Sequence, residues 1–144
     1  METVTKETAL KRITELVDQF DEGYDNYKKT TYDEAKTRGT FIDEFFKALG
    51  WDIHNKEGVD ESYRDVIPED KIKIEGRTKA PDYCFTISGQ RKFFVEAKKP
   101  SVPIKTDNAS VFQLRRYGYH RKLPVSIISN FEEFAVYDCT KKPL

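Results

Sequence analysis

Apolar residues in the N-terminal third of the chain recur at three- and four-residue intervals, which is the spacing of one face of a helix. Residues 4–20 form the first such segment. Its apolar face is made of Leu10, Ile13, Leu16, Val17 and Phe20. The polar residues 21–31 predict a linker, and a second amphipathic helix is predicted over 33–49. Asp33 is suited to cap the start of this helix, and Gly50 is suited to end it.

The rest of the chain is dominated by strand patterns. Residues 54–70 are polar and irregular, with one short strand near their end. The predicted strands, each apolar or alternating, cover residues 63–67, 71–75, 81–88, 91–97, 125–129 and 133–139. Gly89 and Gln90 predict a tight hairpin turn between the third and fourth strands, and a helix over 106–122 follows. This order of elements predicts an α/β fold in which helices flank a central mixed β-sheet.

The composition fits one globular domain. The chain has 144 residues, of which 38% are hydrophobic and 35% are charged, and this length suits a single core. No apolar run approaches the roughly 18 residues that span a bilayer. The N-terminal residues also lack the pattern of a secretion signal, so we expect a cytoplasmic protein. The two cysteines and two histidines are scattered, and they predict no zinc site.

The net charge is zero, but the charges are unevenly distributed. Residues 1–62 carry 9 Lys/Arg and 15 Asp/Glu, a net charge of −6, whereas residues 63–144 carry 16 and 10, a net charge of +6. The neutral total argues against a generally basic nucleic-acid-binding protein. It is compatible with an enzyme that gathers acids around a metal ion and binds phosphates through basic residues nearby.

The predicted hairpin carries the candidate chemistry in Asp82, Glu96 and Lys98. Asp82 opens one strand and Glu96 ends the next, so the hairpin brings the two carboxylates side by side. Glu96 and Lys98 face the same way because side chains alternate along a strand. Carboxylates suit Mg²⁺, with the carbonyl of Ala97 as a further ligand. An ammonium group beside them can orient a water molecule or neutralise charge on a phosphate.

An Asp followed by a Glu-x-Lys motif also occurs in many charged proteins, where a capped turn and an exposed ion pair explain it. Glu96, however, ends the apolar run 93–95, which resembles a central strand and favours a functional site. Gln113 and Tyr117 share one face of the predicted helix, and Glu34 could reach the metal from the first turn of the second helix. Basic residues that suit a DNA backbone are Lys99, Lys105, Arg115, Arg116, Arg121 and Lys122.

Three segments and their spacing carry a resemblance to a known family: DEAKTRGTFIDEFFKALGWDI (33–53), KAPDYCFTISGQRKFFVEAKKP (79–100) and SVFQLRRYGYHRKLPVSIISNFEEFAVYDC (110–139). They resemble the N-terminal nuclease domain of type I restriction-enzyme R subunits and, more closely, that of type IIG restriction-modification enzymes. The resemblance suggests a nuclease core over 32–144, preceded by a helix and linker over 1–31. Thr40 and Glu44 depart from it, since relatives often have an acid and a proline at these positions.

The resemblance implies a restriction-endonuclease-like (PD-(D/E)xK) fold and a Mg²⁺-dependent DNA endonuclease in which Mn²⁺ can substitute. The residues that fall on the family's site are the metal-binding acids Asp82 and Glu96, the helix acid Glu34, the catalytic lysine Lys98, and the QxxxY pair Gln113 and Tyr117.

The resemblance also implies a prokaryotic protein whose partner is double-stranded DNA. In the family, methyltransferase, motor or target-recognition parts accompany this domain, and no AdoMet-binding or Walker motif is present in this chain. A dimer is one way to cut both strands, and no membrane partner is expected. Two alternatives stay open: a non-catalytic DNA-binding or assembly module that keeps the fold, and a nuclease acting on RNA or modified DNA.

Overall fold

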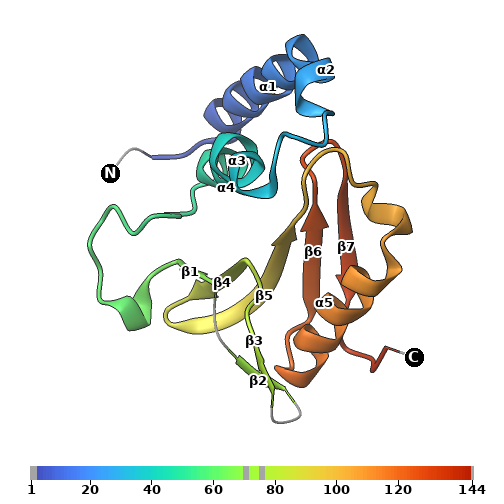
Figure 1. Ribbon diagram of the computed structural model, residues 1–144. Helices are drawn as coiled ribbons and strands as arrows, with labels where there is room; N and C mark the ends of the chain where they lie inside the picture. Colours follow the sequence, from blue (N-terminus) through green and yellow to red (C-terminus); the bar gives the residue numbers. More distant parts are fainter. Residues whose placement is uncertain (1–2, 70–71, 75–76, 144) are drawn as a thin grey trace.

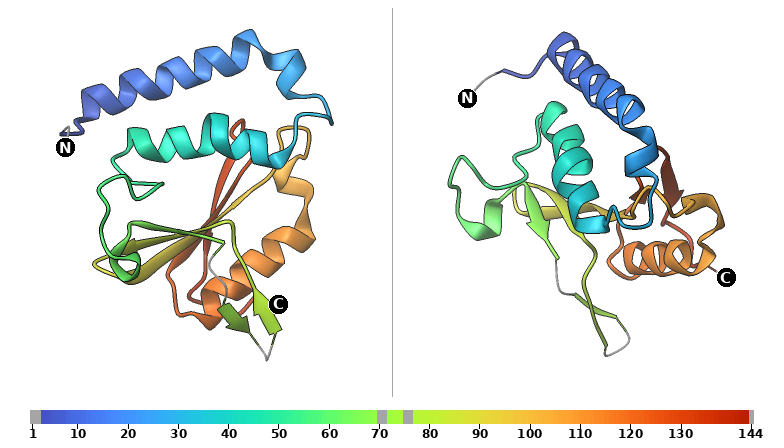
Figure 2. Two further views of the ribbon diagram at one scale, coloured as in Figure 1. Left: turned by 60° about the vertical axis from the view of Figure 1, so that its left-hand side comes forward. Right: turned by 45° about the horizontal axis from the view of Figure 1, so that its top comes forward.

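A five-stranded sheet with helices on both faces forms the body of the molecule (Figures 1 and 2). The computed structural model describes residues 3–69, 72–74 and 77–143. Its α-helices are α1 (Lys6–Glu22), α2 (Tyr24–Tyr27), α3 (Glu34–Thr37), α4 (Asp43–Ala48) and α5 (Asn108–His120). Its strands are β1 (Val66–Pro68), β2 (Ile72–Ile74), β3 (Arg77–Lys79), β4 (Tyr83–Ile87), β5 (Gln90–Ala97), β6 (Val125–Ser129) and β7 (Phe134–Asp138). The predicted mixed sheet flanked by helices is confirmed.

The first predicted helix is present as α1. Thr5 caps it by accepting a hydrogen bond from the amide of Thr8, which satisfies one of the free N–H groups at a helix start. Its Phe20 is buried, whereas Leu10, on the predicted apolar face, is 62% exposed. The expected linker 21–31 is wrong in part, because it contains the short helix α2. The cause is aromatic packing: the Tyr27 ring stacks on that of Phe20 at 5.6 Å between centroids.

The second predicted helix is continuous but not uniform. As predicted, Asp33 caps its start, with its carboxylate accepting a hydrogen bond from the amide of Lys36. Between α3 and α4, Arg38–Ile42 form a π-helical turn, and such turns occur often at functional sites. The wider turn shifts the rotational phase of the helix after residue 38. Gly50 follows its end with a positive φ of 102°, a conformation that favours glycine.

The sheet order is β1-β4-β5-β6-β7. β5 and β6 are parallel, and the other neighbouring strands in this sheet are antiparallel. A parallel pair needs a crossover connection, which α5 supplies. Because β4 and β5 form an antiparallel hairpin, the start of β4 and the end of β5 lie at the same edge of the sheet. β2 and β3 pair separately as a two-stranded ribbon.

The hairpin turn lies one residue earlier than predicted. Ile87 pairs with Gln90, so the turn residues are Ser88 and Gly89 and not Gly89 and Gln90. Ser88 and Gly89 both have positive φ, at 52° and 79°. This backbone matches the right-handed twist of the flanking strands. Between Phe85 and Thr86 the register shifts, because β5 contains one residue more than β4, and this bulge places Tyr83 opposite Val95.

The irregular segment before the hairpin holds a strand that begins later than predicted. Residues 61–63 form a 3-10 turn, and the strand starts at Val66 instead of Tyr63. Asp60 accepts a hydrogen bond from the amide of Ser62 at 2.9 Å, and such a local bond competes with strand pairing. The predicted strand 71–75 corresponds to β2 in its central part, and its end positions 71 and 75 lie outside the described residues.

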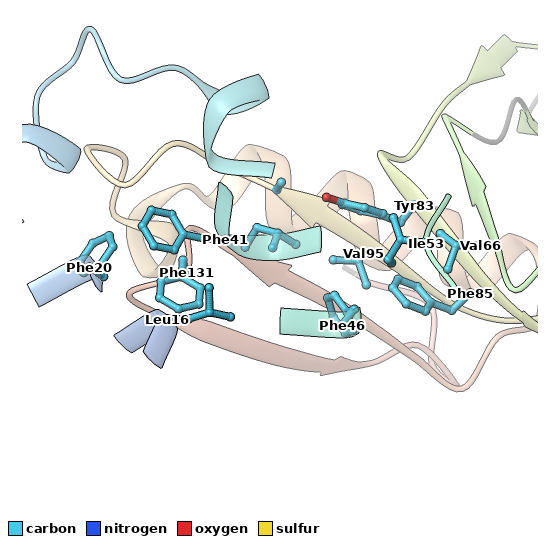
Figure 3. Packing of buried hydrophobic residues seen from close by; sticks show 12 residues of the cluster. Leu16, Phe20, Phe41, Phe46, Ile53, Val66, Tyr83, Phe85, Val95 and Phe131 are labelled. Carbon is cyan, nitrogen blue, oxygen red and sulfur yellow. The ribbon is translucent and has the colours of Figure 1, made fainter. Parts of the chain in front are cut away.

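Two apolar clusters fasten the helices to the two faces of the sheet. The larger cluster joins Leu16 and Phe20 of α1 and Phe41 of the π-helical turn to Phe85 and Val95 of the sheet (Figure 3). The smaller cluster joins α5 to the opposite face, through Leu114 and Tyr117 against Phe94 and Ile128. The described helices include none that combines the length and apolar character needed to cross a bilayer.

The contact of α5 with the sheet is closest at Gly118, where a Cβ atom would lie 2.7 Å from Cys139 Sγ and 2.9 Å from Ser126 Oγ. Gly118→Ala is therefore expected to lower the free energy of unfolding by about 1–3 kcal/mol, as overpacked core sites do. Urea denaturation measures this loss. Adding Cys139→Ala should recover part of it, and strictly additive losses in the double variant would show that the close approach is not the cause.

Candidate active site

Three carboxylates from three different elements meet at the edge of the sheet where β4 begins and β5 ends. Glu34 lies in the first turn of α3, Asp82 precedes β4, and Glu96 lies near the end of β5. Each offers a carboxylate oxygen within 4.8 Å of those of the other two. We call these residues the acidic triad. The pairing of Tyr83 with Val95 sets the two strand positions side by side, as the alternation of the hairpin predicted.

Asp82 is held in place from two sides. Its Oδ2 accepts a hydrogen bond from the backbone N–H of Ala97 at 2.8 Å. Its Oδ1 lies 3.4 Å from Nη1 of Arg38, one turn after Glu34. These contacts orient the carboxylate before any ligand binds. The sequence pattern gave no role to Arg38, because its reach to Asp82 depends on how the helix sits over the sheet.

Burial and mutual repulsion disfavour the charged forms of the carboxylates in the acidic triad. Burial, a hydrogen bond with Asp82 and the charge of that residue raise the pKa of Glu96 to about 9. Burial and the neighbouring Asp82 also raise the pKa of Glu34. Carboxylates that cannot all ionise together indicate a site that favours a positive charge between them. Oxygen ligands at this spacing are what a hard divalent cation requires.

Lys98 opens the second part of the site. Its backbone N–H donates to the carbonyl of Ser129 at 2.9 Å, which extends the pairing of β5 with β6. Its Nζ lies 3.9 Å from Oδ2 of Asp107, while Oδ1 of Asp107 caps α5 by accepting from the amide of Ser110. Asp107 thus links Lys98 to the start of α5. Sequence reasoning missed this residue, although an Asp just before a helix is a recognisable N-cap.

A pocket of about 210 Å³ joins these parts, lined by Ala80, Glu96, Lys98, Ser110, Gln113 and Tyr117. Tyr117 donates a hydrogen bond from its hydroxyl to Oε1 of Gln113 at 3.3 Å. Burial and the charge of Glu96 raise the pKa of Tyr117. The pair predicted on one face of the helix therefore faces the predicted carboxylate and lysine. The structure brings Glu34, Asp82, Glu96, Lys98, Gln113 and Tyr117 to one site.

None of the six predicted DNA-contacting residues lines this pocket. Lys99 donates from Nζ to the carbonyl of Thr30 at 3.1 Å, and Lys105 pairs with Glu133 at 3.4 Å. The guanidinium of Arg115 lies over a tyrosine ring of β7. Arg116, Arg121 and Lys122 remain predicted DNA contacts.

Comparisons with known proteins give the chain a family. A family model described as the N terminus of the type I restriction enzyme R protein matches residues 31–143. The chain is 42% identical over 133 residues to the type II restriction enzyme and methyltransferase RM.Eco57I of Escherichia coli. That match covers 91% of this chain and 13% of the relative, so the chain spans a small part of the relative's length. No solved structure gives a significant match. Because the family model covers most of the chain, the protein belongs to the family of type I restriction enzyme R protein N-terminal domains.

Proposed function

We propose that this domain is a Mg²⁺-dependent endonuclease that hydrolyses DNA phosphodiester bonds as the cleavage module of a restriction-modification enzyme. We further propose that its sheet and helices form the PD-(D/E)xK fold. The observation that carries the proposal is the convergence of the acidic triad with Lys98 at the ends of two neighbouring strands. Family membership supports a restriction role, because the relative's name joins a restriction enzyme to a methyltransferase.

The donor set fits a hard cation. Asp82, Glu96 and Glu34 would hold Mg²⁺, or Mn²⁺ in its place, with the carbonyl of Ala97 as a further ligand. A positive charge at this point would relieve the repulsion that raises the pKa of Glu34 and Glu96. The amide of Ala97 already orients Asp82. When bound, such an ion polarises the scissile phosphate and lowers the pKa of a water molecule.

The remaining residues of the site supply positioning and charge. Lys98 lines the same pocket as Glu96, so its ammonium group would neutralise charge that develops on the phosphate as the bond breaks. Gln113 and Tyr117 present an amide and a hydroxyl to the same space. Hydrogen bonds from these groups would orient the attacking water and the DNA strand.

The wider architecture is also proposed. Residues 32–144 would be the nuclease core, with 1–31 as an added segment that shares its apolar cluster through Leu16 and Phe20. Methyltransferase, motor or target-recognition parts would work with this domain, as the relative's fused activities suggest. Pairing of two such domains would allow both DNA strands to be cut.

Plasmid cleavage tests the proposed function. Purified domain incubated with supercoiled DNA is expected to give nicked and linear products with Mg²⁺ or Mn²⁺ and none with EDTA or Ca²⁺. Calcium accepts six to eight oxygen ligands in a flexible geometry, so it would bind without holding the water tightly. Asp82→Ala is expected to abolish both the products and the binding of Mn²⁺ measured by calorimetry.

The outcomes separate the alternatives. A domain that binds the plasmid but leaves it intact with every metal would be a DNA-binding or assembly module. Cleavage of RNA, or of methylated DNA alone, would assign a different substrate to the same metal site. Rapid cleavage in Ca²⁺ would contradict the proposed role of octahedral coordination.

A further inference from the structure

A second pocket, of about 140 Å³, adjoins the acidic triad on the far side of Asp82. Asp82 and Arg38 form the boundary between the two sites, and the lining includes Arg64, His54 and Tyr83. The pocket therefore contains two guanidinium groups and an imidazole together with the carboxylates of Asp43 and Asp82. The metal chemistry proposed for the acidic triad does not use this pocket.

Arg64 is the unusual member of this pocket. Its side chain is 14% exposed, yet its Nε is buried and has no hydrogen-bond partner within the described part of the chain. Its other nitrogens reach the carbonyl of Ile53 at 3.3 Å and the carboxylate of Glu61 at 3.2 Å. Because Nε is enclosed, the donor of this guanidinium that a ligand can compete for is Nη1, whose partner Glu61 is largely exposed. Glu61, at 80% exposure, is a weak competitor for the guanidinium.

The acids around the pocket are already engaged. Asp43 accepts a hydrogen bond from the hydroxyl of Tyr83 at 2.6 Å, and its other oxygen lies 3.7 Å from His54 Nε2. Asp82 accepts from the amide of Ala97 and pairs with Arg38. A cation bound by Asp82 would compete with Arg38 for that carboxylate and leave the guanidinium available to an anion. The pocket therefore offers positive donors beside a site for a phosphodiester.

We propose that this pocket binds a phosphate group of the DNA backbone next to the phosphate that the acidic triad addresses. The inference rests on the proposed function, which it extends to the path of the substrate. Planar guanidinium groups suit phosphate oxygens because they donate in pairs. The path of the bound strand would then run from the pocket of Lys98 past Asp82 to Arg38 and Arg64.

DNA binding in Ca²⁺ tests the pocket without cleavage, because Ca²⁺ is expected to occupy the acidic triad, compete with Arg38 for Asp82 and leave the DNA intact. Fluorescence anisotropy with two unrelated duplexes of equal length is measured over a series of salt concentrations. Arg64→Gln is expected to weaken binding about tenfold on both duplexes and to reduce the salt slope by about one, as loss of one phosphate contact does. Arg12→Gln removes a positive charge from α1 and serves as the matched control, with an unchanged slope.

The result that overturns the proposal is a wild-type salt slope for Arg64→Gln, or an equal loss for Arg12→Gln. A wild-type domain that neither binds nor cleaves DNA would instead refute the proposed function. If DNA binding is unchanged in Arg64→Gln while inorganic phosphate shifts the His54 imidazole resonances, the pocket takes free phosphate and the DNA assignment is wrong.

A second variant decides the question if Arg64→Gln fails to fold, as judged by circular dichroism. Glu61→Gln alters an exposed side chain and leaves Arg64 in place. Its expected effect is about twofold tighter binding, because a competing surface ion pair has been removed. Glu57→Gln, in the same exposed segment, should change affinity less. Equal effects of the two substitutions would overturn the proposal.

Discussion

Replacing Lys98 by alanine is expected to reduce DNA cleavage by about 10²–10⁴-fold, the range for losing one positioned proton donor or charge-stabilising group. The ammonium group shares a pocket with Glu96, where the reacting phosphate would lie. The side chain is partly exposed, and its ion-pair partner Asp107 is too, so the fold should tolerate its removal. Single-turnover cleavage of a labelled duplex in Mg²⁺ measures the effect on the chemical step.

The matched control is Lys92→Ala. Lys92 lies on β5 near the hairpin turn, at the end of the strand opposite Glu96, so its substitution removes the same charge from the same strand, away from the site. Its variant is expected to cleave at the wild-type rate. Equal rates for wild type and Lys98→Ala, with intact thermal melting in both, would remove Lys98 from the chemistry. A loss of DNA affinity alone would assign it to binding.

The part of this site that the sequence could predict is the part that follows from local strand geometry. The hairpin brings the start of one strand beside the end of the next, and alternation along β5 places Lys98 on the same side as Glu96. The predicted turn was displaced by one residue, and the turn alone would place Asp82 opposite Val95. Asp82 lies beside Glu96 because the register shifts by one residue between Phe85 and Thr86, a bulge that the sequence pattern did not predict. The positive φ of Ser88 was not foreseen, since few non-glycine residues adopt it.

The contacts that the sequence could not predict depend on how separate elements pack. The π-helical turn at Arg38–Ile42 changes the direction in which the later side chains of this helix point. The apolar spacing of the helix looks regular, so no local residue pattern predicts the turn. Arg38 reaches Asp82 only because this helix lies over the start of β4. The ion pair of Lys98 with Asp107 joins residues from two elements in the same way. Helix α2 forms in a polar segment because the ring of Tyr27 stacks on that of Phe20, a contact between residues of two different helices.

Charge counts along the chain do not show which charged side chains are available to DNA. The basic C-terminal part directed attention to α5, but Arg115 lies over a ring of β7 and Lys105 pairs with Glu133. The pocket of Arg38 and Arg64 belongs to the more acidic N-terminal part and its boundary. Its acids are engaged by contacts that only the folded chain contains: Asp43 accepts from Tyr83, and Asp82 pairs with Arg38. A net charge per segment cannot distinguish an engaged carboxylate from a free one.

Glu96→Gln is expected to abolish cleavage and yet stabilise the metal-free domain. The amide of Gln can donate to Asp82 much as a protonated Glu96 does, so the local hydrogen bond survives. Removing the carboxylate removes the repulsion that raises its pKa to about 9. At pH 8 in EDTA the gain in the free energy of unfolding should be of the order of 2 kcal/mol, since partial exposure screens the full effect. Glu22→Gln, which changes an exposed acid at the end of α1, is the control.

The pH dependence gives the sign of the effect. The folded-state pKa of Glu96 lies above its unfolded value of 4.5, so the stability linked to its proton is fully present below pH 4.5. That stability is lost as the pH rises toward 9, with a slope of at most about 1.4 kcal/mol per pH unit for one group. Urea denaturation in EDTA should show this slope in wild type and a much smaller one in Glu96→Gln. Mg²⁺ should then stabilise wild type alone, because only wild type keeps the full ligand set. Equal slopes in EDTA would mean that Glu96 is not protonated in the folded metal-free domain, and equal stabilisation by Mg²⁺ would place the ion elsewhere.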